Sequence, residues 1–350
     1  MLAIKNISIT PEILKFIGEI DEFKGRWQAI ENLAPERLDS LKTVATIESV
    51  GSSTRIEGVK LSDKEVEALL ANIETKSFTT LDQQEVAGYA EVMNLVFASY
   101  QAINITENHI KQLHSILLKY SDRDEDHRGK YKTVNNSVEA FNSDDGKSLG
   151  VVFATATPFE TPLMMETLVD WYNENIMEET QHTLILISTF IVIFLAIHPF
   201  KDGNGRLSRI LTTLLLLRAG YTYVPYSSME SLIESSKESY YLALRRTQQT
   251  IRNPEQNWEP WLVYFLNTMV KQKNNLAHKV QEEQSLKSLL PALSRQILDL
   301  AKARGEISVK DIENITGANR NTIKVHLKKL AEQNYLKVFG QGRGSRYSIA

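Results

Sequence analysis

The chain contains no cysteine among its 350 residues. This absence excludes disulfide scaffolds, thiol nucleophiles and zinc sites with cysteine ligands, and it is compatible with the reducing, cytoplasmic location that we expect. A basic stretch followed by an apolar run is missing from the first ten residues, so no secretory signal is predicted. The composition of 42% hydrophobic and 24% charged residues argues against a disordered chain, and the length predicts about two globular domains.

One uncharged run, residues 183–197, suggests a membrane span at first sight. A spanning helix needs about 20 apolar residues, and this run is shorter and ends at His198 and Pro199. We therefore predict a helix surrounded by other helices, and no membrane partner.

The chain has little net charge, only −3, but its positive and negative residues are unevenly distributed. Residues 291–350 hold eleven Lys and Arg against five Asp and Glu, a net charge of +6, which leaves −9 for the rest. A basic terminal segment on an acidic body indicates a separate domain with its own partner.

Most of the chain has the apolar spacing of helices. We divide it into an N-terminal helical region (1–100), a catalytic core (101–270), a helical linker (271–289) and a C-terminal domain (290–350). Residues 128–153 break the pattern and predict a loop and a β-hairpin with its turn at 144–146. The predicted helices cover 34–50, 64–73, 83–100, 106–118, a segment from about 162, 183–197, 204–218, 228–250, 258–270 and 271–288.

The residues after the apolar run, HPFKDGNGRLSR (198–209), combine features of an anion site. Gly203 and Gly205 let backbone amides approach an anion, and the helix that follows directs its free N–H groups to the same place. Arg206 and Arg209, three residues apart, are expected on one face, where guanidinium groups bind phosphate oxygens.

Two further residues of this stretch supply chemistry. His198 has a side chain suited to accepting a proton near neutral pH. Asp202 is suited to binding a Mg²⁺ ion that bridges phosphates. Phe200 is expected to anchor the loop in the core. Together these residues predict a site for phosphoryl or nucleotidyl transfer.

The stretch resembles the signature of Fic-domain proteins, His-x-Phe-x-(Asp/Glu)-Gly-Asn-Gly-Arg-x-x-Arg, at every fixed position. The resemblance covers most of residues 40–270. It implies a mainly α, Fic-type helical bundle with a β-hairpin flap, and transfer of AMP from ATP, with Mg²⁺, to a Ser, Thr or Tyr hydroxyl of a target protein. It also implies roles by position. The base would be His198, and the metal ligand would be Asp202. The α- and β-phosphates would be bound by Gly203, Asn204 and Gly205, and the outer phosphates by Arg206 and Arg209.

The predicted hairpin lies where the family keeps a flap that docks the target as an added strand. The docking stretch is expected near residues 133–140, beginning with Thr133, Val134 and Asn135.

A second stretch, STRIEG (53–58), resembles the family's inhibitory motif, (Ser/Thr)-x-x-x-Glu-(Gly/Asn). The resemblance implies that Ser53 and Glu57 belong to an inhibitory helix, and that Glu57 pairs with Arg209 and misplaces ATP. Glu57 as a plain exposed helix residue is the alternative. The same glutamate could instead position a water that removes AMP, so the direction of catalysis stays open.

Tyr240 and Tyr241 are candidates for the adenine pocket, because relatives place a tyrosine there and a purine stacks well on an aromatic ring. Two core tyrosines are the alternative, and Asn253 and Trp258 are weaker candidates.

The basic tail resembles a winged helix-turn-helix domain, with helices over 295–304, 308–315 and 319–333 and a two-stranded wing at 335–339 and 346–349. Such domains bind DNA through the third helix and the wing, although they also serve as protein–protein adaptors. The residues expected to contact DNA are Arg320, Lys324, Lys328, Arg343 and Arg346.

The sequence thus predicts an autoinhibited protein adenylyltransferase, able to modify itself as well as a target. The alternative is a nucleotide-sensing, DNA-binding transcription regulator. A transferase of phosphate or another nucleotide is a third hypothesis, which the intact Gly-Asn-Gly-Arg disfavours. A homodimer is a further expectation, which rests only on the observation that many relatives form dimers.

Overall fold

The computed structural model divides into two compact units, residues 1–275 and 276–350, which are described separately. The described residues are 4, 7–33, 35–71, 78–141, 148–333, 335–340 and 344–349, and their side chains are described except in 30–37, 137–154 and 283–289. The predicted boundaries after residues 100, 270 and 289 stay predictions.

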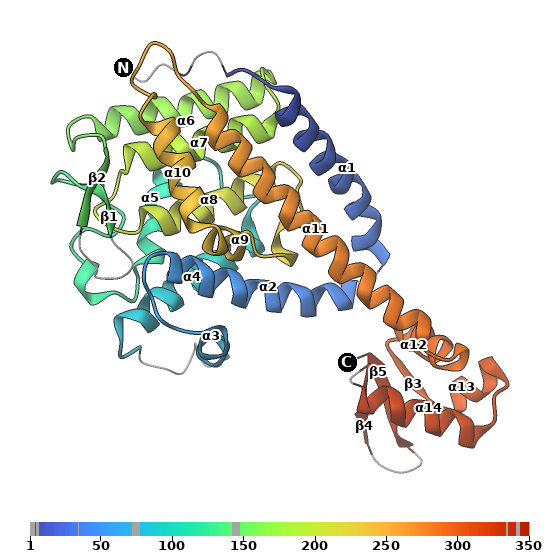
Figure 1. The fold of residues 1–350 in the computed structure, drawn as a ribbon. Coiled ribbons are helices and arrows are strands. Elements are labelled where there is room, and N and C mark those ends of the chain that lie inside the picture. The colour runs from blue at the N-terminus through green and yellow to red at the C-terminus, as the bar shows by residue number, and fades with distance from the viewer. Residues whose placement is uncertain are drawn as a thin grey trace. The chain divides into compact units, whose positions relative to one another are not determined.

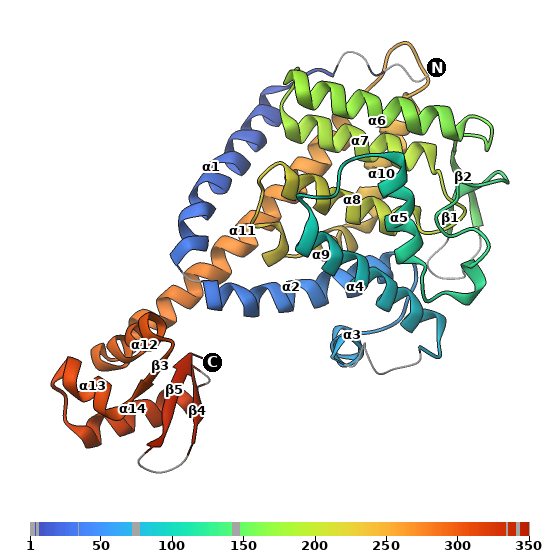
Figure 2. The same cartoon turned by 180° about the vertical axis from the view of Figure 1, so that it is seen from behind.

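The first unit is mainly helical, as predicted, with one β-hairpin (Figures 1 and 2). Its α-helices are α1 (Pro11–Leu33), α2 (Pro35–Ile56), α3 (Asp63–Leu70), α4 (Leu81–Ser99), α5 (Glu107–Leu117), α6 (Thr161–Glu178), α7 (Thr183–Ile197), α8 (Asn204–Arg218), α9 (Met229–Ser235), α10 (Lys237–Gln248) and the greater part of α11 (Glu259–Leu289). Two short 3₁₀ helices lie at Asp122–Asp124 and Val224–Tyr226.

The apolar helix α7 is the centre of this unit. Thirteen of its fifteen residues are buried, and it packs between α6 and α8. Trp261 of α11 donates its indole N–H to the carbonyl of Ser188 at 2.7 Å. A helix that is apolar all round is expected to be buried in this way, and within the described residues no helix is long and apolar enough to cross a membrane.

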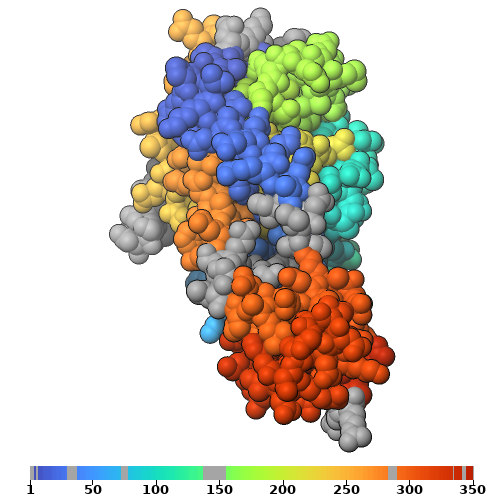
Figure 3. Space-filling view, turned by 90° about the vertical axis from the view of Figure 1, so that its right-hand side faces the viewer, coloured from blue at the N-terminus to red at the C-terminus, as the bar shows by residue number. Residues whose placement is uncertain are grey.

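Helix α1 was not predicted from the sequence. It lies beside α11, and an ion pair of 3.4 Å joins Glu19 to Lys273. In the space-filling view α1 forms a blue surface ridge next to the orange of α11 (Figure 3). Its apolar face, with Ile13, Ile20 and Trp27 completely buried, covers the core.

Two predictions about the later helices were wrong. The single helix over 228–250 is broken at Ser236, whose side chain bonds the carbonyl of Leu232 and the hydroxyl of Tyr264. A serine that bonds nearby backbone in this way competes with helix continuation. The helices over 258–270 and 271–288 are instead one continuous helix, α11.

The predicted hairpin is present as two antiparallel strands, β1 (Ser137–Phe141) and β2 (Ser148–Ala154). Its register shifts twice, after Val138 and after Ala140. The predicted turn at 144–146 lies outside the described residues.

The second unit contains the end of α11, three further helices and a sheet. The helices are α12 (Ala292–Arg304), α13 (Val309–Thr316) and α14 (Arg320–Glu332), and the antiparallel strands are β3 (Glu306–Ser308), β4 (Leu336–Phe339) and β5 (Arg346–Ile349). The predicted two-stranded sheet is a three-stranded one in the order β3-β5-β4. The missed strand β3 is short, and its one buried side chain, Ile307, gives no alternating pattern to recognise.

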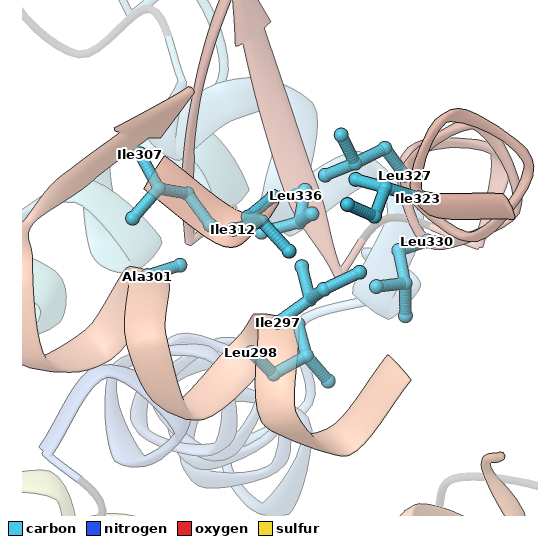
Figure 4. Packing of buried hydrophobic residues seen from close by; sticks show 9 residues of the cluster. All are labelled: Ile297, Leu298, Ala301, Ile307, Ile312, Ile323, Leu327, Leu330 and Leu336. Carbon is cyan, nitrogen blue, oxygen red and sulfur yellow. The ribbon is translucent and has the colours of Figure 1, made fainter. Parts of the chain in front are cut away.

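A small apolar core holds this unit together (Figure 4). Helix α14 contributes Ile323, Leu327 and Leu330. Ile297 of α12 and Ile312 of α13 are buried against them. Removing about 25 cal/mol of unfavourable hydration per Å² of apolar surface is the main stabilising contribution of such a core.

Candidate active site

The loop between α7 and α8 has an unusual backbone at its first residue. His198 adopts the left-handed conformation (φ 54°) and ends α7 with a bond from its N–H to Phe194 O at 2.9 Å. Gly203 (φ 78°) precedes the first residue of α8, where a non-glycine residue would be strained. The chain thus stops one buried helix and starts another within six residues.

Asn204 closes this loop with its side chain. The N–H of Phe200 donates to Asn204 Oδ1 at 2.9 Å, and Asn204 Nδ2 donates to Phe200 O at 2.8 Å. Phe200 itself is fully buried, as predicted for an anchor. The amide of Asn204 is therefore committed to the loop, and only its backbone remains for the predicted phosphate contact.

A second histidine, which sequence reasoning missed, supports the loop from α5. The ring of His114 stacks on Phe200 with 3.8 Å between centroids. Its Nδ1 accepts from the N–H of Gly129 at 2.8 Å, so Nε2 carries the proton and donates to Asp202 O at 3.0 Å. Burial lowers the pKa of His114 to about 4, which keeps the ring neutral.

The predicted base, His198, has the opposite tautomer. Its Nδ1 lies 3.3 Å from Leu195 O, an acceptor only, so Nδ1 carries the proton and Nε2 keeps its lone pair. Burial lowers the pKa of His198 to about 4, and the nearby charge of Lys132 acts in the same direction. The imidazole is therefore neutral and ready to accept a proton at pH 7.

A cavity of about 130 Å³ joins most of the predicted site residues. Its lining includes His198, Asp202, Gly203, Asn204, Gly205, Arg209, Tyr240, Tyr241 and Glu57. The N-terminus of α8 opens into the same cavity, and its unsatisfied N–H groups and dipole favour an anion there.

Glu57 lies against Arg209, as the resemblance implied. Arg209 Nη2 donates to Glu57 Oε1 at 2.8 Å, and the same guanidinium donates to Ser53 Oγ at 2.7 Å and Ser53 O at 2.9 Å. Burial, the largest single effect, would raise the pKa of Glu57, but the charge and hydrogen bond of Arg209 together with the charge of Arg206 outweigh it, and the pKa lies below its ordinary value. Glu57 follows the last residue of α2 instead of lying within the helix.

Arg206 and Arg209, which the sequence predicts on one face, have different ion-pair partners. Arg206 is buried and pairs with Glu85 of α4 at 2.8 Å and with Asp202 at 3.3 Å. Arg123 completes this group, at 3.1 Å from Glu85 and 3.2 Å from Asp202. Glu85 and Arg123 were missed because nothing in their local sequence distinguishes them from surface charges.

A metal at this site would depend on Asp202. Within the described residues no group of three or more His, Cys, Asp or Glu is arranged to hold a metal ion. Mg²⁺, however, commonly uses one or two carboxylates together with water and phosphate oxygens. Asp202 lines the cavity, is partly exposed, and has a pKa that Arg206 and the N–H of Gly203 lower against the effect of burial. An ionised carboxylate at the mouth of an anion site fits the ion.

The two tyrosines differ in their surroundings. Tyr240 is buried in an aromatic cluster with Trp261 and Tyr264, both at 5.8 Å between centroids. Tyr241 is partly buried, and burial raises its pKa to about 12. Both rings line the cavity. That either ring binds adenine stays a prediction. Neither Asn253 nor Trp258 lines it.

The flap and tail residues remain untested in their roles. Thr133, Val134 and Asn135 are exposed, immediately before β1. In the second unit Arg320, Lys324 and Lys328 are exposed on α14, and Arg346 pairs with Glu306 at 3.5 Å. Arg343 lies outside the described residues.

The chain is similar to several known proteins. Residues 104–216, which include the 198–209 stretch, match the Fic/DOC family model. A probable protein adenylyltransferase of Aquifex aeolicus is 30% identical over 105 residues, 30% of this chain and 32% of that protein. The protein adenylyltransferase Fic of Drosophila willistoni is 26% identical over 226 residues, 63% of this chain and 42% of that protein. The chain thus spans less than half the length of these curated relatives.

Solved structures with the Fic fold resemble the chain. A Fic family protein from Desulfovibrio desulfuricans covers 99% of this chain and 98% of its own, with a TM-score of 0.64 and 22% identity. A Fic domain containing signaling protein from Bacteroides thetaiotaomicron covers 74% and 95%, with a TM-score of 0.60 and 24% identity. The chain thus has the fold of these structures, and its residues 104–216 match the Fic/DOC family model.

Proposed function

We propose that the protein transfers AMP from ATP to a hydroxyl group of a target protein. The observation that carries the proposal is that a neutral imidazole and the N-terminus of a buried helix line one cavity. The names of the curated relatives, protein adenylyltransferases, support the same reaction.

The residues of the site account for each step of this reaction. The target hydroxyl oxygen attacks the α-phosphorus, its proton goes to His198 Nε2, and the bond to pyrophosphate breaks. The amides at Gly203 to Gly205 and the guanidinium groups offset charge on the triphosphate. Mg²⁺ bound by Asp202 would neutralise phosphate oxygens. A base of this kind contributes about 10²- to 10⁴-fold to the rate.

Intact mass spectrometry tests the proposal directly. The Glu57→Gly variant, incubated with ATP and Mg²⁺, is expected to gain the mass of one or more adenylyl groups on itself or on a protein of an added lysate. The double variant Glu57→Gly/His198→Ala is the control, and it is expected to gain none. A gain equal to a phosphate, or the same gain in both variants, would contradict the proposal.

We further propose that Glu57 inhibits the enzyme. Its carboxylate occupies the guanidinium of Arg209, which a γ-phosphate would otherwise use. A Cβ at Gly205 would collide with Glu57 Oε1, so the carboxylate also lies over the amides predicted to cradle phosphate. Removal of AMP by a water that Glu57 positions is the reverse direction, and incubation of a purified modified target with wild-type enzyme separates the two.

For the second unit we propose a winged helix-turn-helix domain that binds duplex DNA. Exposed cations on α14 favour this function. Arg320, Lys324 and Lys328 lie at the surface and are not part of the apolar core. Affinity of the full chain for duplex DNA should fall steeply with salt. The triple variant with alanine at these positions should abolish it, and equal binding by both would contradict the proposal. The comparisons lend no support to a nucleotide-sensing transcription regulator as the whole protein's function, and the expected homodimer is a separate prediction.

A further inference from the structure

The loop that carries His198 is held from outside by the segment before the flap. Four consecutive carbonyl groups, residues 197–200, accept hydrogen bonds from Lys132 or Asn136. Lys132 Nζ donates to Ile197 O at 3.0 Å and its backbone N–H donates to Pro199 O at 2.9 Å. Asn136 Nδ2 lies 3.3 Å from His198 O and 2.8 Å from Phe200 O.

These bonds stabilise the end of α7 and the unusual backbone that follows it. The last carbonyls of α7 have no partners within the helix, and the left-handed backbone of His198 needs its surroundings to hold it. An ammonium group at the C-terminal, negative end of α7 is also favoured by the helix dipole. Lys132 and Asn136 supply both the donors and the cation.

The two side chains are themselves fixed. Lys132 is 3% exposed and donates to Asn136 Oδ1 at 2.6 Å and to Thr155 Oγ1 at 3.1 Å. Thr155, just after β2, contacts Asn136 O at 2.7 Å. A buried ammonium that has only neutral partners is costly, and burial lowers the pKa of Lys132 to about 8.

We propose that Lys132 and Asn136 are positioning residues, which hold the 197–200 backbone so that the imidazole of His198 faces the target hydroxyl. This inference rests on the proposed function. The exposed residues Thr133, Val134 and Asn135 lie between Lys132 and Asn136. The predicted docking stretch and the loop that carries His198 are therefore joined by the same two residues. The distance between a docked target and His198 is then fixed by the anchors.

Lys132→Met tests the inference, because it keeps most of the length of the side chain and removes its ammonium donors. We examine it in the Glu57→Gly background, with self-modification at saturating Mg²⁺ and ATP as the probe. The rate is expected to fall about 10- to 100-fold, as for a misplacement of about 1 Å. ATP affinity, measured by calorimetry, should not change, because the amides of α8 are untouched. Asn136→Ala should act in the same way.

Two variants serve as controls. Lys130→Met removes an exposed lysine of the same segment, whose ammonium group donates to Asp126 O at 3.1 Å, and it should leave the rate unchanged. Lys132→Arg retains donors towards Ile197 O and should restore most of the rate. A slow Lys132→Arg, or equal loss of ATP affinity and rate in Lys132→Met, would overturn the inference.

Histidine NMR of the full chain gives a readout that does not depend on activity. The seven histidines can be labelled, and His198 and His114 differ in tautomer. In Lys132→Met the His198 ring signals should broaden or lose their single Nδ1–H tautomer, while His114 keeps its Nε2–H signals. Unchanged His198 signals, or equal changes at both histidines, would contradict a positioning role. If Glu57→Gly transfers no AMP, the proposed function fails, whereas this spectrum still decides on the anchors.

Discussion

Glu57 and Arg209, 152 residues apart in sequence, form an ion pair with 2.8 Å between Oε1 and Nη2. The arginine side chain is buried, whereas a third of the glutamate side chain is exposed at the cavity. Ser53 Oγ accepts a hydrogen bond from Nε of the same guanidinium at 2.7 Å. The end of α2 and the start of α8 are thus locked together at the place where a triphosphate would enter.

Replacing Glu57 should make the guanidinium of Arg209 accessible to a triphosphate. Glu57→Gly is expected to strengthen ATP binding about 5- to 150-fold, the usual range for coupling between two competing interactions. Glu57→Gln keeps the shape of the side chain and loses its charge, so it should give an intermediate affinity. Calorimetric titration with Mg²⁺ and ATP measures all three proteins. Equal affinities would mean that Glu57 does not compete with nucleotide.

The end of α2 is anchored by a second ion pair, and this pair should set how firmly Glu57 is held. Arg55 bonds Glu234 of α9 through two nitrogens, at 2.7 and 3.0 Å, and also bonds Asp63 at 2.9 Å. Arg55→Met should lower the free energy of unfolding by about 1–3 kcal/mol, as for a lost charged hydrogen-bond group. It should also raise basal AMP transfer, because the end of α2 is then free to move.

Arg26→Met is the matched control for this measurement. Arg26 forms a 3.6 Å pair with Glu22, and both side chains are more than 60% exposed. An exposed pair contributes about 0–1 kcal/mol, so stability and basal transfer should hardly change. Equal effects of the two variants in urea unfolding would show that the Arg55 pair is not an anchor.

Asn204 should matter chiefly as a clamp. It is 2% exposed and makes two bonds to Phe200. Asn204→Ala leaves the buried N–H of Phe200 without its partner, which costs about 1–3 kcal/mol, whereas Phe200 O keeps its bond from Asn136 Nδ2. The exposed Asn253 provides the control, Asn253→Ala, for which a change within about 0.5 kcal/mol is expected. Urea unfolding of both variants decides whether the difference exists.

How far the sequence predicted this molecule depends on whether the signal was local. The apolar α7 and the Gly-rich start of α8 are local signals, and they were recognised. The break at Ser236 depends on a bond to Tyr264, which is distant in sequence, so no local pattern announced it. Strand β3 is too short to show alternation.

The same division applies to the site. The 198–209 stretch carries its own spacing and could be read directly. The roles of Lys132, Asn136, His114 and Glu85 arise only when folding brings α4, α5 and the segment before the flap against that stretch. A lone lysine or asparagine in a loop gives no such indication. Conversely, sequence spacing placed Arg206 beside Arg209, whereas tertiary partners direct the two guanidinium groups to different carboxylates.

The buried His114 should make stability depend on pH. Its pKa is about 4 in the folded protein and about 6.5 in the unfolded chain, so the unfolded state binds more protons between these values. Stability from this residue is therefore present above pH 6.5 and is lost as the pH falls towards 4, by about 1.4 kcal/mol per pH unit. Urea unfolding at pH 7, 6 and 5 measures the slope. His114→Gln should reduce the slope, and an unchanged slope would mean that His114 is not the titrating group.

The transfer of AMP by His198 is tested most directly by placing the label at two positions of ATP. The Glu57→Gly variant, with Mg²⁺ and a cell lysate, should incorporate radioactivity from α-labelled ATP and none from γ-labelled ATP. Adding His198→Ala should abolish the α-label. Incorporation from the γ-position, or equal α-labelling with and without His198, would contradict the account.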